Sequence, residues 1–195
     1  TSSGIKRMGD DILQSRWSSL NTFFDWCLKR GYIDKNPMGV VNRPKNNTEH
    51  KVTYLTKAEI NKLFKAIDKN ENEVFRMRDK TIISLALATA LRVSAIVNIN
   101  VDDIDFENGV IQVVEKRQKV REIPMGENTM NMLREYVEFR ARAYDEINSL
   151  ALFLTKNHNR LSVWDANDML EKYCDWAGIK RVTFHKIRAS SACAL

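Results

Sequence analysis

Three stretches of this sequence combine residue types that could do chemistry at a phosphate group. Arg92 stands inside the apolar stretch ALATALRVSAIVNI, Lys116 lies in the basic run EKRQK, and His185 precedes Arg188 by three residues in FHKIR. A guanidinium binds phosphate oxygens through a two-bond fork, whereas lysine and histidine side chains can donate or accept protons. Binding an oxyanion and moving a proton beside it would need these residue types.

Each of these positions also has a structural interpretation. The stem of Arg92 could pack along the core while its head reaches water or pairs with a carboxylate. Lys116 could belong to a solvated turn, and His185 could be a hydrogen-bonded core histidine beside a surface Arg188. The residues alone leave both interpretations open at all three places.

The elements that must position these residues follow from the apolar spacing. Apolar residues at three- and four-residue intervals predict a helix from Ile12 to Leu28, with Gly31 as its stop. Residues 41–54 show no period, and Thr56 with Glu59 has the spacing of a capping box that opens a second domain. Within that domain the pattern predicts a helix at 78–99, two short strands around the EKRQK turn ending at Pro124, and helices at 130–147, 162–177 and from about Phe184. Ser162 precedes Asp165 by three residues, so a capping box is also predicted at the start of the helix at 162–177.

These elements predict a mainly α protein with a small antiparallel β-sheet, an α+β fold of two lobes. The 195 residues are 44% hydrophobic and 29% charged, as in soluble globular proteins, and 31 basic against 25 acidic residues give a net charge of +6. That charge weakly favours an anionic partner such as nucleic acid. Cys27, Cys174 and Cys193 are odd in number and far apart, which predicts reduced thiols in a cytoplasmic protein. The sequence contains no run of eighteen apolar residues and no secretion signal, so we expect no membrane association.

The three stretches resemble the tyrosine recombinase (phage integrase) family in order, local sequence and spacing. ATALRVSAIVNINVDDID is similar to the arginine box of that family, and Lys116 follows Arg92 by 24 residues (116 − 92) in a hairpin whose second strand, VREIPM, also matches. FHKIR is similar to the H-x-x-R box, and SRWSSLNTFFDWCLKRGYIDKNPMGVVNRPK is similar to the end of the core-binding domain. The resemblance therefore covers nearly the whole chain.

The resemblance implies a tyrosine-recombinase catalytic domain preceded by part of a helical core-binding domain. Residues 1–45 would be the end of the core-binding domain, 46–54 a linker, and 55–195 a catalytic domain truncated at its C-terminus. The implied reaction cleaves and rejoins DNA through a 3′-phosphotyrosyl link without metal or other cofactor. Arg92 and Arg188 would stabilise charge on the phosphate, Lys116 would protonate the leaving 5′ oxygen, and His185 would accept a proton or hydrogen bond. On this basis we expect Arg92 to be buried and thereby preorganised.

The sequence departs from the family pattern at four points. Ala90 replaces a usual glycine, Ala95 stands where an acidic residue commonly supports the arginine, and Ala189 replaces a second histidine. In addition, no tyrosine follows the H-x-x-R box, so we expect a fragment that binds DNA without cleaving it. A catalytically inactive DNA-binding regulator with the recombinase fold is the alternative that Ala95 and the missing tyrosine favour.

Another class of function is a metal-dependent nuclease or transposase. Asp102, Asp103 and Asp105 could supply carboxylates for a divalent cation, although three acidic residues so close together more often cap and solvate a turn. We expect no metal site.

The partner that we expect is double-stranded DNA, bound through both lobes by a homo-oligomer of two to four protomers. Phosphate contacts provide much of DNA affinity and come mostly from basic side chains. The densest basic positions predict these contacts at Arg43, Lys45, Arg117, Lys119 and Arg121, near Lys116. The resemblance further implies a protein encoded by a prokaryote, a phage or a mobile element and located in the cytoplasm.

Overall fold

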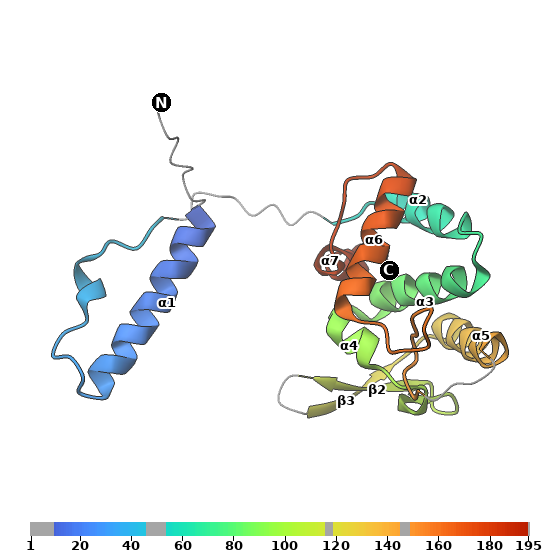
Figure 1. The fold of residues 1–195 in the computed structure, drawn as a ribbon, viewed down its shortest axis with the longest axis horizontal. Coiled ribbons are helices and arrows are strands. Elements are labelled where there is room, and N and C mark those ends of the chain that lie inside the picture. The colour runs from blue at the N-terminus through green and yellow to red at the C-terminus, as the bar shows by residue number, and fades with distance from the viewer. Residues whose placement is uncertain (1–9, 46–53, 116–118, 145–148, 195) are drawn as a thin grey trace. The chain divides into compact units, whose positions relative to one another are not determined.

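The computed structural model describes residues 10–45, 54–115, 119–144 and 149–194. The chain forms two compact units, Thr1–Lys51 and Val52–Leu195, which Figure 1 draws with a thin trace between them. No helix in the described part of the chain is long and apolar enough to cross a lipid bilayer.

The first unit consists of one long helix and a returning segment. Helix α1 spans Asp10–Lys29 and Gly31 follows it with φ of 73°, which confirms the predicted helix and its stop. The indole of Trp17 donates to the carbonyl of Val41 at 3.0 Å, so the returning segment lies along the helix. Many apolar side chains of α1 stay exposed, among them Ile12, Leu20, Phe23 and Trp26.

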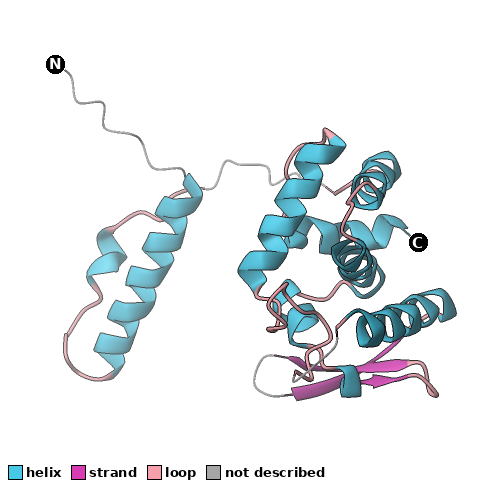
Figure 2. Ribbon diagram, turned by 45° about the vertical axis from the view of Figure 1, so that its right-hand side comes forward, coloured by secondary structure: helices cyan, strands magenta, loops and turns pink. Residues whose placement is uncertain are grey.

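The second unit is a helical domain with a small sheet (Figures 1 and 2). This architecture confirms the predicted mainly α fold. The central helix is α3, which packs against α2, α4, α5 and α7. In chain order the elements are α2 (Lys57–Asp68), α3 (Glu73–Thr89), α4 (Val93–Asn98), β1 (Ile104–Asp105), β2 (Val110–Glu115), β3 (Lys119–Pro124), α5 (Glu127–Ala143), α6 (Val163–Ala177) and α7 (Phe184–Ala194).

Capping boxes begin two of these helices, as their sequences predict. The Thr56 hydroxyl accepts from the Glu59 amide at the start of α2, and the Ser162 hydroxyl accepts from the Asp165 amide at the start of α6. The carboxylates reach back to the cap residues, and these hydrogen bonds lower the pKa of both Glu59 and Asp165.

The predicted hairpin is confirmed, and it belongs to a three-stranded antiparallel sheet in the order β1-β2-β3. Ile111 pairs with Ile123 and Val113 with Arg121, while Ile111 and Val113 are buried. The strand β1 was not predicted, because two residues are too few to show an alternating pattern.

The helix predicted for residues 78–99 is wrong as a single element. Helix α3 ends at Thr89, Ala90 adopts the left-handed conformation (φ 52°, ψ 27°), and Arg92 is extended (φ −71°, ψ 144°) before α4 begins. The hydroxyl of Thr89 accepts from the Leu91 amide at 3.2 Å and stabilises the turn. The apolar run continues through this break because both helices face the same core.

Helix α5 also differs from its predicted range of 130–147. It begins three residues earlier, at Glu127, and ends at Ala143 because the backbone of Tyr144 is extended (φ −120°, ψ 118°). The ring of Tyr144 then packs in a small buried cluster with Ala151 and Leu154. The packing of Tyr144 therefore outweighs the helical spacing of apolar residues that predicted a longer helix.

A buried polar network ties α3 to α6 and to the end of α2. Asp79 is fully buried, and its carboxylate accepts from the Arg78 guanidinium at 2.7 Å and from the Tyr173 hydroxyl at 2.8 Å. The amide of Asn70 donates to the same hydroxyl at 2.6 Å. Burial raises the pKa of Asp79, while the neighbouring Arg78 opposes that rise.

Candidate active site

A hollow of about 620 Å³ lies where the start of α4, the β2–β3 hairpin and α7 meet. Three arginines line it: Arg92, Arg121 and Arg188. None of the described residues around the hollow is acidic. The guanidinium groups of Arg92 and Arg188, facing one hollow with no described carboxylate in its lining, have the chemistry to bind an oxyanion such as phosphate.

Arg92 reaches the hollow from the N-cap position of α4. Its carbonyl accepts from the amides of Ala95 and Ile96 at 2.9 and 3.1 Å, which fixes the backbone of this residue. The expectation that Arg92 is buried is wrong, because the break between α3 and α4 moves it from the middle of an apolar helix to an exposed junction. Within the described residues its guanidinium makes no hydrogen bond or ion pair, so it is open to a ligand.

Two nearby alanines explain part of this geometry. The αL conformation of Ala90 is the one that glycine adopts without steric cost, which gives a physical reason for glycine at the corresponding family position. Ala95 lines the hollow with a methyl group, so it supplies no acceptor to Arg92. Ser94 and Asn98 lie four residues apart on α4 and add a hydroxyl and an amide to the lining. Sequence reasoning missed these two polar residues, although their helical spacing beside Ala95 was a signal.

Arg188 reaches the same hollow from α7. Phe184 and Ile187 are buried and α7 packs against α3, so the half-buried Arg188 lies on the outer part of the helix. The hydroxyl of Ser190 accepts from the Leu55 amide at 2.7 Å and donates to the Lys186 carbonyl, which ties the helix to the start of the second unit.

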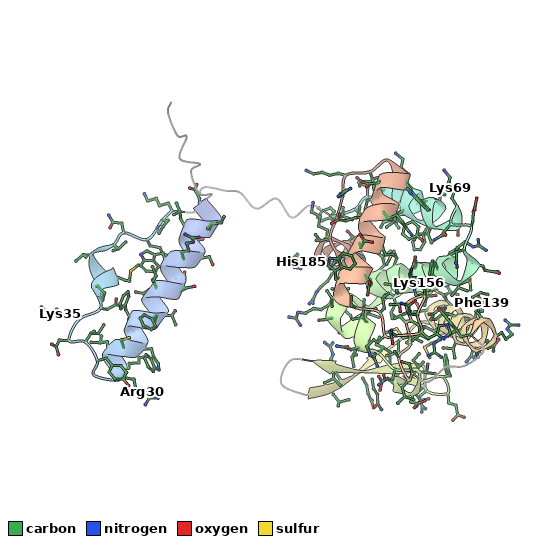
Figure 3. All side chains as sticks on the ribbon, in the orientation of Figure 1. Arg30, Lys35, Lys69, Phe139, Lys156 and His185 are labelled. Atoms are coloured by element: carbon green, nitrogen blue, oxygen red, sulfur yellow. The ribbon has the colours of Figure 1, made fainter. Side chains whose placement is uncertain are left out.

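His185 shares α7 with Arg188 but is not among the residues that line the hollow. Its side chain is exposed at the edge of the second unit (Figure 3). The structure therefore brings Arg92 and Arg188 to one hollow, although 96 positions (188 − 92) separate them, and leaves His185 exposed on α7 outside the lining of the hollow.

The remaining predicted residues fall in three groups. Arg121 was predicted as a DNA contact, and the structure places it in the hollow. Lys116 and Arg117 lie outside the described residues, and of Lys119 the structure describes the backbone at the start of β3. Arg43 and Lys45 are exposed in the first unit, where the Arg43 guanidinium lies 5.7 Å from the centre of the Trp17 ring.

Two of the three aspartates considered for a metal, Asp103 and Asp105, have other roles. Asp103 accepts from the Asn100 amide at 2.7 Å, and Asp105 accepts from the amides of Glu107 and Asn108. The hydrogen bonds from Asn108 lower the pKa of Asp105. These carboxylates therefore organise a turn, and no cluster of three potential metal ligands occurs in the part of the chain that the structure describes.

The fold and the hollow together define a helical domain with a small sheet and an arginine-lined hollow. The chain belongs to the phage integrase family, whose model matches residues 53–195. Among curated relatives, the tyrosine recombinases XerC of Escherichia coli O157:H7 and of Salmonella typhi are each 30% identical over 192 and 193 residues. The alignments cover 96% of this chain and 61% of each relative, so the chain spans about three fifths of their length.

Solved structures show the same fold. The Tn1549 transposon integrase in complex with circular intermediate DNA has a TM-score of 0.75 at 23% identity, covering 96% of this chain and 67% of that one. A lambda integrase dimer bound to a COC′ core site has a TM-score of 0.69 at 18% identity, covering 92% and 64%. At these identities the likeness establishes the architecture of the chain.

Proposed function

We propose that this chain is the DNA-binding and phosphate-activating part of a tyrosine-type site-specific recombinase. The observation that carries the proposal is the convergence of Arg92 and Arg188 on one hollow that no described carboxylate lines. Family membership and the XerC relatives support the reaction class. The domain division follows the same reasoning: residues 1–45 end a core-binding domain, 46–54 link it, and 55–195 belong to the catalytic domain.

In the proposed reaction, a tyrosine oxygen attacks the phosphorus of a DNA phosphodiester. The bond to the 5′ oxygen of the next deoxyribose breaks, and a 3′-phosphotyrosyl link forms. Arg92 and Arg188 stabilise the charge that develops on the non-bridging oxygens, and Lys116 gives a proton to the leaving 5′ oxygen. His185 accepts a proton or hydrogen bond. When the 5′ hydroxyl of another strand later attacks the phosphotyrosine, the diester is restored and the tyrosine is released.

The proposed substrate is double-stranded DNA, contacted by both units in a homo-oligomer in the cytoplasm. Arg43, Lys45, Arg117, Lys119 and Arg121 bind phosphates around the reacting one. Support comes from the structural neighbours, which include a lambda integrase dimer on a core site and a lambda integrase tetramer on a Holliday junction. A phage or other mobile element of a prokaryote is the proposed source of the chain.

The nucleophile must come from outside the described part of the hollow. Its described lining includes no tyrosine, and Tyr136, Tyr144 and Tyr173 are buried. The 195-residue chain alone is therefore proposed to bind DNA without forming a covalent adduct. A trap with a nicked duplex tests this, because an adduct on the chain would show that one of its own tyrosines is the nucleophile.

The salt dependence of DNA affinity tests the binding part of the proposal. The wild-type dissociation constant should rise steeply with salt, and Arg92→Met or Arg188→Met should each reduce the log–log slope by about 1. Arg134→Met is the matched control, since this exposed arginine of α5 contacts Asn131 and the Phe106 ring. A flat wild-type slope, or equal effects of all three variants, would refute the proposal.

A second candidate, an inactive DNA-binding regulator, is favoured by Ala95, which gives Arg92 no carboxylate, and by the absence of a tyrosine from the described lining of the hollow. A binding measurement with orthovanadate and a duplex that lacks one phosphate distinguishes the recombinase from the regulator. Pentacovalent vanadate resembles the phosphoryl-transfer transition state, which only a recombinase site should stabilise. A recombinase site should bind the gapped duplex about tenfold tighter with vanadate, a gain of about 1.4 kcal/mol. No gain in the wild type would favour the regulator.

A further inference from the structure

Arg160 makes three hydrogen bonds at the C-terminal end of α4, opposite the end that carries Arg92. Its guanidinium donates to the carbonyls of Val97 and Ile99 at 3.0 and 3.4 Å and to the side-chain oxygen of Asn100 at 2.5 Å. The last carbonyls of a helix have no partner within the helix, and a cation there also interacts favourably with the helix dipole. Arg160 therefore provides the Val97 carbonyl, in the last turn of α4, with a partner from a distant part of the sequence.

Helix α4 needs such support because it is very short. Its six residues form a rod about 9 Å long, well below the length at which an isolated helix is stable. Ile96 and Val97 are buried and α4 packs against α6, which holds one face of the helix. Arg160 fixes the helix at a second point through its hydrogen bond to the Val97 carbonyl in the last turn.

The backbone of Arg160 is itself anchored in the core. Leu154 and Arg160 form a β-bridge, and the Leu161 amide donates to the Phe153 carbonyl at 2.9 Å. The Leu152 amide donates to the Ile99 carbonyl, also at 2.9 Å. Phe153 and Leu161 are buried, so the guanidinium extends from a fixed base.

Arg92 depends on the placement of α4 more than a paired arginine would. Its side chain has no hydrogen bond or ion pair within the described residues, and Ala95 offers it no carboxylate. What fixes Arg92 is its backbone, through the amides of Ala95 and Ile96 that donate to its carbonyl. Any movement of this short helix therefore moves the root of the Arg92 side chain.

We propose that Arg160 is a positioning residue for Arg92, acting through α4. The consequence for the reaction rests on the proposed function, since it assumes that Arg92 binds the phosphate. Arg160 takes the place of a carboxylate partner beside Arg92: it fixes the helix from the far end and leaves the Arg92 guanidinium unpaired for the phosphate.

Hydrogen exchange tests the positioning without any ligand. In Arg160→Met, the amides of Ala95 and Ile96 should exchange at least tenfold faster than in the wild type. Arg181→Met is the matched control, because Arg181 is an exposed arginine that bonds Glu171 and Asp175 near the end of α6. Unchanged protection of the two amides in Arg160→Met would overturn the proposal.

Titration with inorganic phosphate, followed by the NMR signals of the arginine side chains, tests the consequence for the site. Arg160→Met should weaken phosphate binding about tenfold at a temperature where it is fully folded, and Arg181→Met should not. Arg160→Lys keeps the charge but lacks the fork, so it should restore only part of the affinity, and it replaces Arg160→Met if that variant does not fold.

The two measurements fail in different ways. If the wild type does not bind phosphate through Arg92 and Arg188, the proposed function is wrong, while exchange at Ala95 and Ile96 still decides the role of Arg160. If exchange is faster but phosphate affinity in the folded variant is unchanged, Arg160 supports only the helix and the positioning proposal is overturned.

Discussion

Arg78 and Arg92 carry the same side chain in opposite environments. Arg78 is buried on α3, where it pairs with Asp79 at 2.7 Å and donates to the Leu154 carbonyl. Arg92 is exposed at the start of α4 and faces a hollow with Arg121 and Arg188. The buried arginine has acceptors from its own chain, whereas the exposed one has none among the described residues.

This difference separates a structural guanidinium from a ligand-binding one. A buried charge must be paired, because an unpaired one loses its hydration without compensation. A guanidinium that binds an external anion must instead stay unpaired and be held through its backbone. The same substitution made at each of the two arginines should therefore affect stability and binding differently.

The largest effect is expected from Arg78→Met. This change leaves Asp79 as a buried carboxylate without its cation, and we expect the free energy of unfolding to fall by about 3 kcal/mol at neutral pH. Urea denaturation measures it. Lys80→Met on the same helix is the control, since its exposed pair with Asp68 is worth less than about 1 kcal/mol.

The pH dependence of Arg78→Met follows from the raised pKa of Asp79. A raised pKa means that the folded state holds the proton more tightly, so the contribution of Asp79 to stability falls as pH rises from about 4 through the folded pKa. Arg78 opposes the rise in the pKa of Asp79, so without Arg78 the loss of stability with rising pH is larger. The destabilisation should therefore be smaller near pH 4 than near pH 7, and an equal loss at both would contradict the network.

A smaller effect is expected from Ser162→Ala, at the start of the helix α6 that packs against α4 and contributes Tyr173 to the buried network. Losing the cap should cost about 1 kcal/mol. The hydrogen bonds of Ser162 lower the pKa of Asp165, a stabilisation that is present above the unfolded pKa and lost as pH falls through the folded pKa. Unfolding measured in acid and at neutral pH should thus show the variant and the wild type converging in acid, whereas Ser162→Thr should behave as the wild type does.

Ala90→Gly tests how the backbone presents Arg92. Alanine at φ of 52° is strained and glycine is not, so the exchange should stabilise the second unit by about 0.5 kcal/mol after the greater entropy of unfolded glycine is included. Ala95→Gly, inside α4, should destabilise the second unit by a similar amount, because glycine disfavours the helix. A loss of stability in Ala90→Gly would mean that the methyl group of Ala90 contributes packing that outweighs the strain.

The sequence predicts elements better than the junction between them. Capping boxes at Thr56 and Ser162, the glycine after α1 and the β2–β3 hairpin are local signals, and the structure confirms each. The break at Ala90 is not readable from periodicity, because alanine carries no signal for a left-handed backbone and the apolar run is continuous. The expectation of a buried Arg92, drawn from the resemblance, placed Arg92 inside that run and is wrong for the same reason.

Arg92 and Arg188 were found by resemblance and Arg121 by the density of basic residues, but their arrangement required the fold. Arg92 and Arg188 line one hollow because α4 and α7, which are distant in sequence, both pack against α3. The place of Arg121 in the hollow depends on its register opposite Val113. The hydrogen bonds of Arg160 at the end of α4 could not be predicted from the sequence, since they join one side chain to carbonyls 61 and 63 positions away.

The smallest effect on stability is expected from Arg92→Met, the same substitution as in Arg78→Met. The side chain is exposed and has no described partner, so the free energy of unfolding should change by less than about 0.5 kcal/mol. Arg92 and Arg188 line one hollow and repel each other, so removing one charge should be slightly stabilising at low salt and neutral at high salt. Urea denaturation at low and at high salt measures the change in the free energy of unfolding under each condition. A loss of about 2 kcal/mol or more would show that Arg92, like Arg78, is a structural cation, because only a side chain that the folded chain itself uses can cost so much when it is removed.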